Sequence, residues 1–189
     1  MDHDQRPVLL LDIDDVVCTN SPYGGFDAKV EFAKLDGSLV NYHECAPDLW
    51  EKLFVHYAKS LLSNIDREFH PWYVLTTSWW WHFTCDELID VLRRGGLGFI
   101  ASNLHKDWAT PKGRRPGLRW AEIKGWVEAH PECASRWAVL DDELSGTGFG
   151  ATHPESEAPY IVLCCEDVGF TVVEYVRLRA ALARRLGRI

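Results

Sequence analysis

The chain has 189 residues, of which 47% are hydrophobic and 25% charged. This composition is typical of one globular domain and excludes an intrinsically disordered chain. No apolar run approaches the roughly 18 to 20 residues that span a bilayer. The polar N-terminus lacks the basic stretch and apolar region of a signal peptide, so we expect a cytoplasmic protein. The net charge of −8 does not favour nonspecific binding to polyanions.

The N-terminal third of the chain predicts a strand, a hairpin and a helix. The apolar run over residues 8–13 fits a strand buried in a parallel sheet. Two short alternating runs flank Asp36-Gly37 and predict a β-hairpin over residues 29–42. A helix over residues 47–62, opened by its proline, follows.

From residue 72 onward, strands and helices alternate. The predicted strands are short apolar runs over residues 72–77, 98–101, 137–140 and 160–164. The predicted helices, two of which begin with capping-box spacing, cover residues 84–94, 118–129 and 171–186. Alternating strands and helices predict an α/β fold with a mainly parallel sheet covered on both faces.

Three predicted strands end at polar side chains, namely Asp12, Thr76 and Asp141. Ligands of parallel sheets bind beyond the carboxyl ends of the strands, so neighbouring strands would bring these groups into one crevice. Asp14 and Asp142 lie beside two of them. Such acids can hold Mg²⁺, which offsets the repulsion between an aspartate and a phosphate ester. Alone, the pair Asp12 and Asp14 would more often be a solvated strand end, and the second acidic strand favours a site.

These motifs resemble those of the haloacid dehalogenase-like (HAD) superfamily of aspartyl phosphotransferases. Their order and spacing both match over three segments, residues 9–16, 74–77 and 139–142. The resemblance implies a Rossmann-like three-layer α/β sandwich in a single domain over residues 1–189. It also implies a minimally capped phosphatase, with a hairpin and helix over residues 20–66 as the cap. The threonine motif followed by Trp79 is similar to the HAD domains of nucleic-acid repair proteins.

The resemblance implies catalytic roles for the motif residues. Asp12 would attack phosphorus and form an aspartyl-phosphate. Asp14 would protonate the leaving oxygen and then deprotonate the hydrolytic water. Thr76 would hydrogen-bond the phosphoryl group, with Thr77 or Ser78 as alternatives.

The resemblance also implies a Mg²⁺ ion bound by Asp12, Asp141 and Asp142, with the backbone carbonyl of Asp14 as a further ligand. Asp15 stands where many relatives carry Gly. Because Asp tolerates unusual backbone angles better than most residues, we expect little damage from this departure.

The family needs a Lys or Arg to steady the phosphoryl oxygens, and the sequence offers several candidates. Arg119 lies in the first turn of a predicted helix, on the same face as Ile123 and Trp126. Lys112 lies in the preceding loop, and Lys124 lies a turn deeper, where it is less able to reach. We favour Arg119 over Lys112, although either could be a surface cation.

The substrate class stays open. A minimal cap suits a large substrate, such as a nucleic-acid end or a phosphoprotein. The stretch of basic residues from Lys106 to Lys124 is either a solvated surface or a landing place for a phosphorylated substrate. Trp79 either packs in the core or stacks on a base or sugar. The basic stretch and the tryptophans favour nucleic acid, whereas the net charge does not.

Three other functions compete with a phosphatase. A phospho-receiver domain carries its acid pair early in the chain, whereas Asp141 and Asp142 come late. A non-catalytic HAD-like binding protein and a metal-dependent nuclease are the other two. The six cysteines are expected to be reduced thiols, and no Cys/His group shows the spacing of zinc ligands. The oligomeric state stays open.

Overall fold

The computed structural model describes residues 6–35, 47–111, 119–143 and 154–189. Within these ranges five strands form one sheet in the order β3-β2-β1-β4-β5, and every neighbouring pair is parallel. The strands are β1 (Val8–Leu11), β2 (Trp72–Leu75), β3 (Leu104–Ala109), β4 (Trp137–Asp142) and β5 (Ile161–Cys164). The predicted parallel α/β fold is confirmed.

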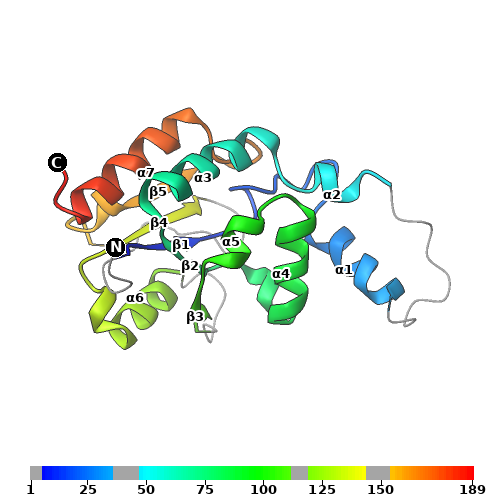
Figure 1. Ribbon diagram of the computed structural model, residues 1–189, viewed down its shortest axis with the longest axis horizontal. Coiled ribbons are helices and arrows are strands. Elements are labelled where there is room, and N and C mark those ends of the chain that lie inside the picture. The colour runs from blue at the N-terminus through cyan, green and yellow to red at the C-terminus, as the bar shows by residue number, and fades with distance from the viewer. Residues whose placement is uncertain (1–5, 36–46, 112–118, 144–153) are drawn as a thin grey trace.

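Helices cover both faces of the sheet, as Figure 1 shows. They are α1 (Gly25–Leu35), α2 (Leu49–Lys52), α3 (His56–Phe69), α4 (Cys85–Arg94), α5 (Gly98–Ser102), α6 (Arg119–Ala129) and α7 (Val172–Arg185). Side chains of a strand alternate between faces, so Leu9 and Leu11 join the core beneath α3 and α7. Val8 and Leu10 face the other way and pack with α6. The result is the expected three-layer, Rossmann-like sandwich.

Two predicted elements are wrong. Residues 29–35 belong to α1 rather than to a hairpin, because Ala28 and Phe32, four residues apart, both pack on the core; residues 36–42 of that prediction lie outside the described ranges. Residues 98–101 form α5 rather than a strand, because buried Leu97, Ile100 and Ala101 have helical spacing. The true edge strand β3 is mostly polar and half-exposed, so no apolar pattern marked it.

The predicted helices over residues 84–94, 118–129 and 171–186 correspond to α4, α6 and α7, whereas the one over residues 47–62 is not continuous. The predicted helix over residues 47–62 is divided into α2 and α3, and α3 continues to Phe69. Both predicted capping boxes are present, at the starts of α4 and α7. Among the described helices, none combines the length and the apolar character needed to cross a bilayer. The cysteines in the described ranges are free thiols, namely Cys18, Cys85, Cys133, Cys164 and Cys165.

The loop after β1 is held by the loop after β5. Asp15 adopts a positive φ of 52°, a backbone conformation that Asp tolerates better than most residues. Its Oδ1 accepts a hydrogen bond of 3.1 Å from the backbone N–H of Asp167. The N–H of Phe170 donates to the carbonyl of Val16 at 2.8 Å. The loop that carries the first acidic motif therefore depends on a distant segment for its shape.

Gly169 and Gly187 form a matched pair that tests this dependence. A Cβ at Gly169, whose φ is +76°, would lie 2.8 Å from the carbonyl oxygen of Val16, whereas Gly187, with a φ of +64°, has nothing within 4 Å. Gly187→Ala should lower the free energy of unfolding by about 1 to 2 kcal/mol, the cost of the left-handed conformation. Gly169→Ala should cost roughly 1 to 3 kcal/mol more, because the backbone must also move. Chemical denaturation measures both, and equal losses would contradict the contact between the loops.

Candidate active site

The three strand ends that the sequence singled out lie side by side in the sheet. Leu11 pairs with Leu75 on one side and with Leu140 on the other. The next residue on each strand is therefore part of one row, namely Asp12, Thr76 and Asp141. All three side chains are at most 1% exposed. The structure thus brings together residues that are 64 and 65 positions apart in the sequence.

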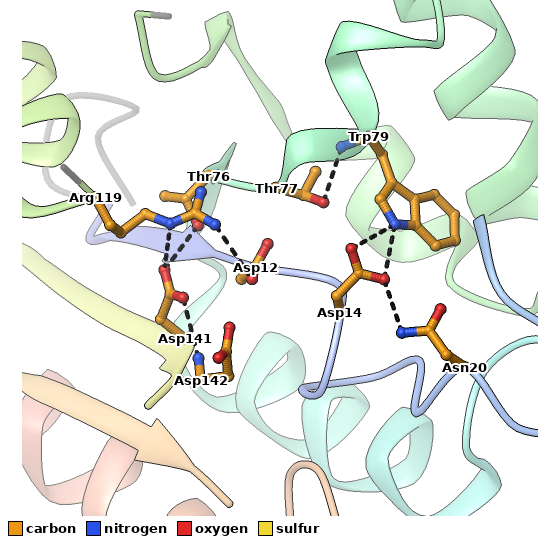
Figure 2. A network of polar contacts seen from close by, with 9 residues as sticks. All are labelled: Asp12, Asp14, Asn20, Thr76, Thr77, Trp79, Arg119, Asp141 and Asp142. Carbon is orange, nitrogen blue, oxygen red and sulfur yellow. Dashed lines mark hydrogen bonds and ion pairs between the residues drawn. The ribbon is translucent and has the colours of Figure 1, made fainter. Parts of the chain in front are cut away.

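Arg119 joins the members of this row (Figure 2). Its guanidinium lies 3.4 Å from Oδ2 of Asp12 and 3.3 Å from Oδ2 of Asp141. The hydroxyl of Thr76 donates to the same Oδ2 of Asp141 at 3.1 Å. The backbone N–H of Asp142 donates to Oδ1 of Asp141 at 3.0 Å. The row is therefore a connected polar network inside the protein rather than a set of solvated acids.

The position of Arg119 follows from the direction of α6. This helix begins at Arg119, beside the carboxyl ends of the strands, and its buried face continues through Ile123 and Trp126. Lys124 lies on the exposed side of the helix and pairs with Glu128 at 3.5 Å. Lys112 lies outside the described ranges. Of the candidate cations that the structure describes, Arg119 is the one that contacts the row.

Burial dominates the electrostatics of the row. It raises the pKa of Asp12 well above the ordinary value; Arg119 counteracts this effect, and Asp141 and Asp14 add to it. Burial likewise raises the pKa of Asp141 to about 7. For Arg119, burial alone would lower the pKa, but the carboxylates of Asp12 and Asp141 outweigh burial and raise it. The row is therefore short of positive charge even with Arg119 in place.

The acidic residues fit a divalent metal ion. Asp12, Asp141 and Asp142 each offer a carboxylate oxygen, and these oxygens lie within 4.8 Å of one another. Oδ1 of Asp12 is buried and has no hydrogen-bond partner in the described part of the chain. A buried carboxylate oxygen without a donor is costly, and a metal ion would satisfy it. Oxygen ligands of this kind are those that Mg²⁺ prefers.

Asp14 lies apart from this cluster although it is only two residues from Asp12. The indole Nε1–H of Trp79 donates to both of its carboxylate oxygens at 2.9 Å, and the amide of Asn20 donates to Oδ1 at 3.3 Å. Figure 2 shows the carboxylate turned toward Trp79 and away from Arg119. Burial raises the pKa of Asp14, while the hydrogen bonds from Trp79 and Asn20 lower it. The two acids of the first motif therefore occupy different environments.

A cavity of about 740 Å³ opens beside Asp14. Helix α1 contributes Phe26, which is 72% exposed, and Lys29, whose ammonium pairs with Glu87 at 2.8 Å. The short 3-10 helix Ser78–Trp81 contributes Ser78 and Trp79 to the wall. This space is the natural approach to Asp14 from solvent.

The predicted substrate contacts of the threonine motif differ in exposure. Thr77 is fully buried, and its Oγ1 accepts a hydrogen bond of 3.2 Å from the N–H of Trp79, so it caps the 3-10 helix. The ring of Trp79 is 3% exposed and lies against Phe54 and Phe83. Ser78 is half-buried on the cavity wall.

Sequence reasoning missed three residues of this region. Asn20 follows the first motif and carries no local signal of its contact with Asp14. Phe26 and Lys29 were missed because α1 was predicted as a loop and a hairpin. Without a helix there, nothing in the sequence placed these two side chains on one face beside the site. A helical period around Ala28 and Phe32 would have been the signal.

The comparison with family models shows which protein family the chain belongs to. Residues 8–174 match the model described as the HAD domain in Swiss Army Knife RNA repair proteins. The chain belongs to this family. The match includes every residue of the row, and it confirms both the HAD resemblance and the closer similarity to HAD domains of nucleic-acid repair proteins. Neither the search of curated proteins nor that of solved structures found a match.

Asp12→Asn should stabilise the metal-free HAD domain above neutral pH. An acid whose pKa is raised by folding binds its proton more tightly in the folded state, so stability falls as pH rises through the interval between the two pKa values. For Asp141 this interval runs from about 4, the ordinary pKa of an aspartate, to about 7. For Asp12 the interval starts at the same ordinary pKa, and its upper end, the folded-state pKa, lies well above that ordinary value. The neutral isostere removes the charge, and we expect a gain of about 1 kcal/mol, or roughly 2 to 4 °C in Tm.

Thermal unfolding in EDTA at pH 8 and pH 4.5 measures this effect. The gain should be present at pH 8 and absent at pH 4.5, where Asp12 is protonated in the wild type. Asp90→Asn, on the surface of α4, is the matched control and should show no such pH dependence. A variant that is less stable than wild type at pH 8 would refute the predicted charge excess.

Proposed function

We propose that this HAD domain is a Mg²⁺-dependent phosphohydrolase that cleaves a phosphomonoester through an aspartyl-phosphate on Asp12. The observation that carries the proposal is the buried row of Asp12, Thr76 and Asp141 against Arg119, in a chain that belongs to a HAD family. This arrangement supplies a nucleophile, a hydrogen-bond donor, a cation and metal ligands at one point. Lys112 remains a second candidate for the phosphate-binding cation.

The first half of the reaction would take place at Asp12. One carboxylate oxygen of Asp12 forms a bond to phosphorus while the bond from phosphorus to the ester oxygen breaks and that oxygen takes the electron pair. Arg119 and the hydroxyl of Thr76 would stabilise the charge on the phosphoryl oxygens. Asp12, Asp141 and Asp142, with the backbone carbonyl of Asp14, would hold Mg²⁺. When bound, the ion offsets negative charge on the transferring phosphoryl group.

Asp14 would move the protons of both steps. Its pKa is raised by burial, which favours the protonated form that would donate to the leaving oxygen. The resulting carboxylate would then accept a proton from the water that attacks the aspartyl-phosphate. Trp79 and Asn20 would hold the carboxylate in position between the two steps.

We propose a phosphorylated nucleic-acid end as the substrate. The family is described by its occurrence in RNA repair proteins, and the cavity beside Asp14 has an exposed aromatic side chain, Phe26, next to the cation Lys29. Aromatic rings of this kind stack on bases, and the half-buried Ser78 on the cavity wall would add a polar contact. The Trp79 ring is 3% exposed, so its part would be to hold Asp14 rather than to stack on a base. The net charge of −8 argues for few phosphate contacts, so binding should depend weakly on salt.

We also propose that the protein works in the cytoplasm. The free thiols of Cys18, Cys85, Cys133, Cys164 and Cys165 are typical of a reducing compartment.

The test of the proposed function is phosphate release from p-nitrophenyl phosphate and from oligonucleotides phosphorylated at the 3′ or 5′ end. Wild type should turn over with Mg²⁺ and not with EDTA. Asp12→Asn should lose at least roughly 1,000-fold in kcat, because removal of a covalent nucleophile costs this much or more. Asp90→Asn is again the matched control and should retain wild-type turnover.

Each outcome of this assay separates the competing functions. Turnover that survives Asp12→Asn would exclude Asp12 as the nucleophile and favour a metal-activated water, as in a nuclease. A folded wild type without turnover on any substrate would favour a binding or phospho-receiver role. A preference for one oligonucleotide end over p-nitrophenyl phosphate would support the nucleic-acid substrate.

Trp79→Phe should change the pH dependence of turnover. Phenylalanine keeps an aromatic ring beside Phe54 and Phe83 but removes the N–H that donates to Asp14. Since that hydrogen bond lowers the pKa of Asp14, its loss should raise the pKa and move the pH profile of kcat to higher pH. We expect kcat to fall by roughly 10- to 100-fold, part of what general acid–base catalysis contributes.

The control for this variant is Trp81→Phe, since Trp81 is 40% exposed and lies on the same 3-10 helix. It should leave the pH profile in place. A Trp79→Phe profile that coincides with wild type would rule out a positioning role for the indole.

A further inference from the structure

A second group of metal-ligating side chains lies where the edge strand β3 meets the end of α6. His105 and Asp107 are two residues apart on β3 and so share one face of the strand. His130 follows the last residue of α6. Each of the three offers one ligand atom, and these atoms lie within 4.8 Å of one another. None of the three belongs to the acidic row.

The hydrogen bonds of His130 show which of its ring atoms is able to bind an ion. Its Nδ1 lies 2.7 Å from the backbone carbonyl oxygen of Trp126. A carbonyl only accepts, so Nδ1 must carry the proton and donate it. Nε2 lies 2.9 Å from Oδ2 of Asp107. In a neutral imidazole that nitrogen holds a lone pair, which would face another acceptor. Either a second ring proton, which makes His130 an imidazolium, or a metal ion bound by both atoms resolves the conflict.

The surroundings of His130 match those of a metal ligand. Histidines that bind metals usually donate their other ring N–H to a backbone carbonyl or carboxylate, which fixes the tautomer and the ring orientation. The carbonyl of Trp126 plays this part here. The Trp126 indole also stacks on the His130 ring, with centroids 3.9 Å apart, and its Nε1–H donates to the carbonyl of Asp107 at 2.9 Å. The donors are therefore held in place before any ion arrives.

His105 completes the donor set. Its Nδ1 accepts a hydrogen bond of 3.1 Å from the N–H of Asp107, so this lone pair faces Asp107 and an ion bound there would replace the hydrogen bond. The rings of His105 and His130 are nearly perpendicular, at 88°, with centroids 5.2 Å apart. Two imidazole nitrogens that converge on one carboxylate are the donors of many zinc sites.

The distances allow a tetrahedral ion after a small adjustment. Bonds of about 2.0 to 2.2 Å place two ligands of a tetrahedral ion roughly 3.3 to 3.5 Å apart. Oδ2 of Asp107 must therefore move away from Nε2 of His130 by a few tenths of an ångström. The Asp107 side chain is 55% exposed, so it is free to make this movement and the group is open to ions from solvent.

We propose that His105, Asp107 and His130 bind a divalent transition-metal ion of the zinc class, with a fourth position open to water. The ion would clamp β3 to the end of α6, the helix whose first residue is Arg119. Nitrogen-containing donor sets favour Zn²⁺, whereas the all-oxygen cluster of Asp12, Asp141 and Asp142 suits Mg²⁺. The proposal is independent of the phosphatase reaction.

The experiment is Zn²⁺ titration by calorimetry of the full-length, tag-free, metal-stripped protein. The background carries Asp12→Asn and Asp141→Asn, so that the acidic cluster does not compete for the ion. We expect one equivalent of Zn²⁺ to bind and to raise Tm, and Co²⁺ to give the visible absorption of a tetrahedral site. His105→Asn and the surface variant Asp107→Asn should each weaken Zn²⁺ binding by at least about 10-fold, since even indirect partners of a metal contribute this much.

His56→Asn is the matched control, because His56 is an exposed histidine on α3 outside the group. It should bind Zn²⁺ as the background does. Absence of saturable binding in a folded background would show that Asp107 and His130 form a plain ion pair and would overturn the proposal. Binding that survives both His105→Asn and Asp107→Asn, or that is lost equally in His56→Asn, would overturn it as well.

Discussion

The burial of several carboxylates at one edge of the sheet is the constraint around which the site is built. Asp12 and Asp141 lie on adjacent strands and are almost completely excluded from water. A buried charge must be paired or neutralised, and Arg119 meets only part of this need. The pKa values of both acids remain raised, which shows that Arg119 does not fully compensate for their burial. A divalent ion and a phosphate ester would arrive at a place that is already short of positive charge.

Two carboxyl groups only two residues apart are suited to different tasks because their partners differ. Asp12 faces Arg119 inside the row, while Asp14 is turned to the indole of Trp79 (Figure 2). The left-handed turn at Asp15 sends the chain away from the strand. Environments that separate two acids in this way are typical of a nucleophile paired with an acid–base group.

Helix α6 links the two candidate metal sites of the described chain. Its first residue, Arg119, contacts the acidic row, and the residue after its end, His130, contacts Asp107 on β3. The helix packs on the sheet through Ile123 and Trp126. Fixing its far end would therefore restrict the helix that carries Arg119, a coupling through a rigid element.

The sequence by itself determined the parallel α/β fold, the family and the motif residues, because apolar runs that end in acids are local patterns. It favoured Arg119 from the periodicity of α6, and the structure places that side chain against Asp12 and Asp141. Only the tertiary structure decided the rest. The polar edge strand β3 lacks a distinctive local pattern, and the helical period of α1 was overlooked beside the stronger turn signal of Asp36-Gly37. The contact of Asn20 with Asp14 depends on the shape of the loop after β1, and that of His105 with His130 exists only because packing brings distant segments together.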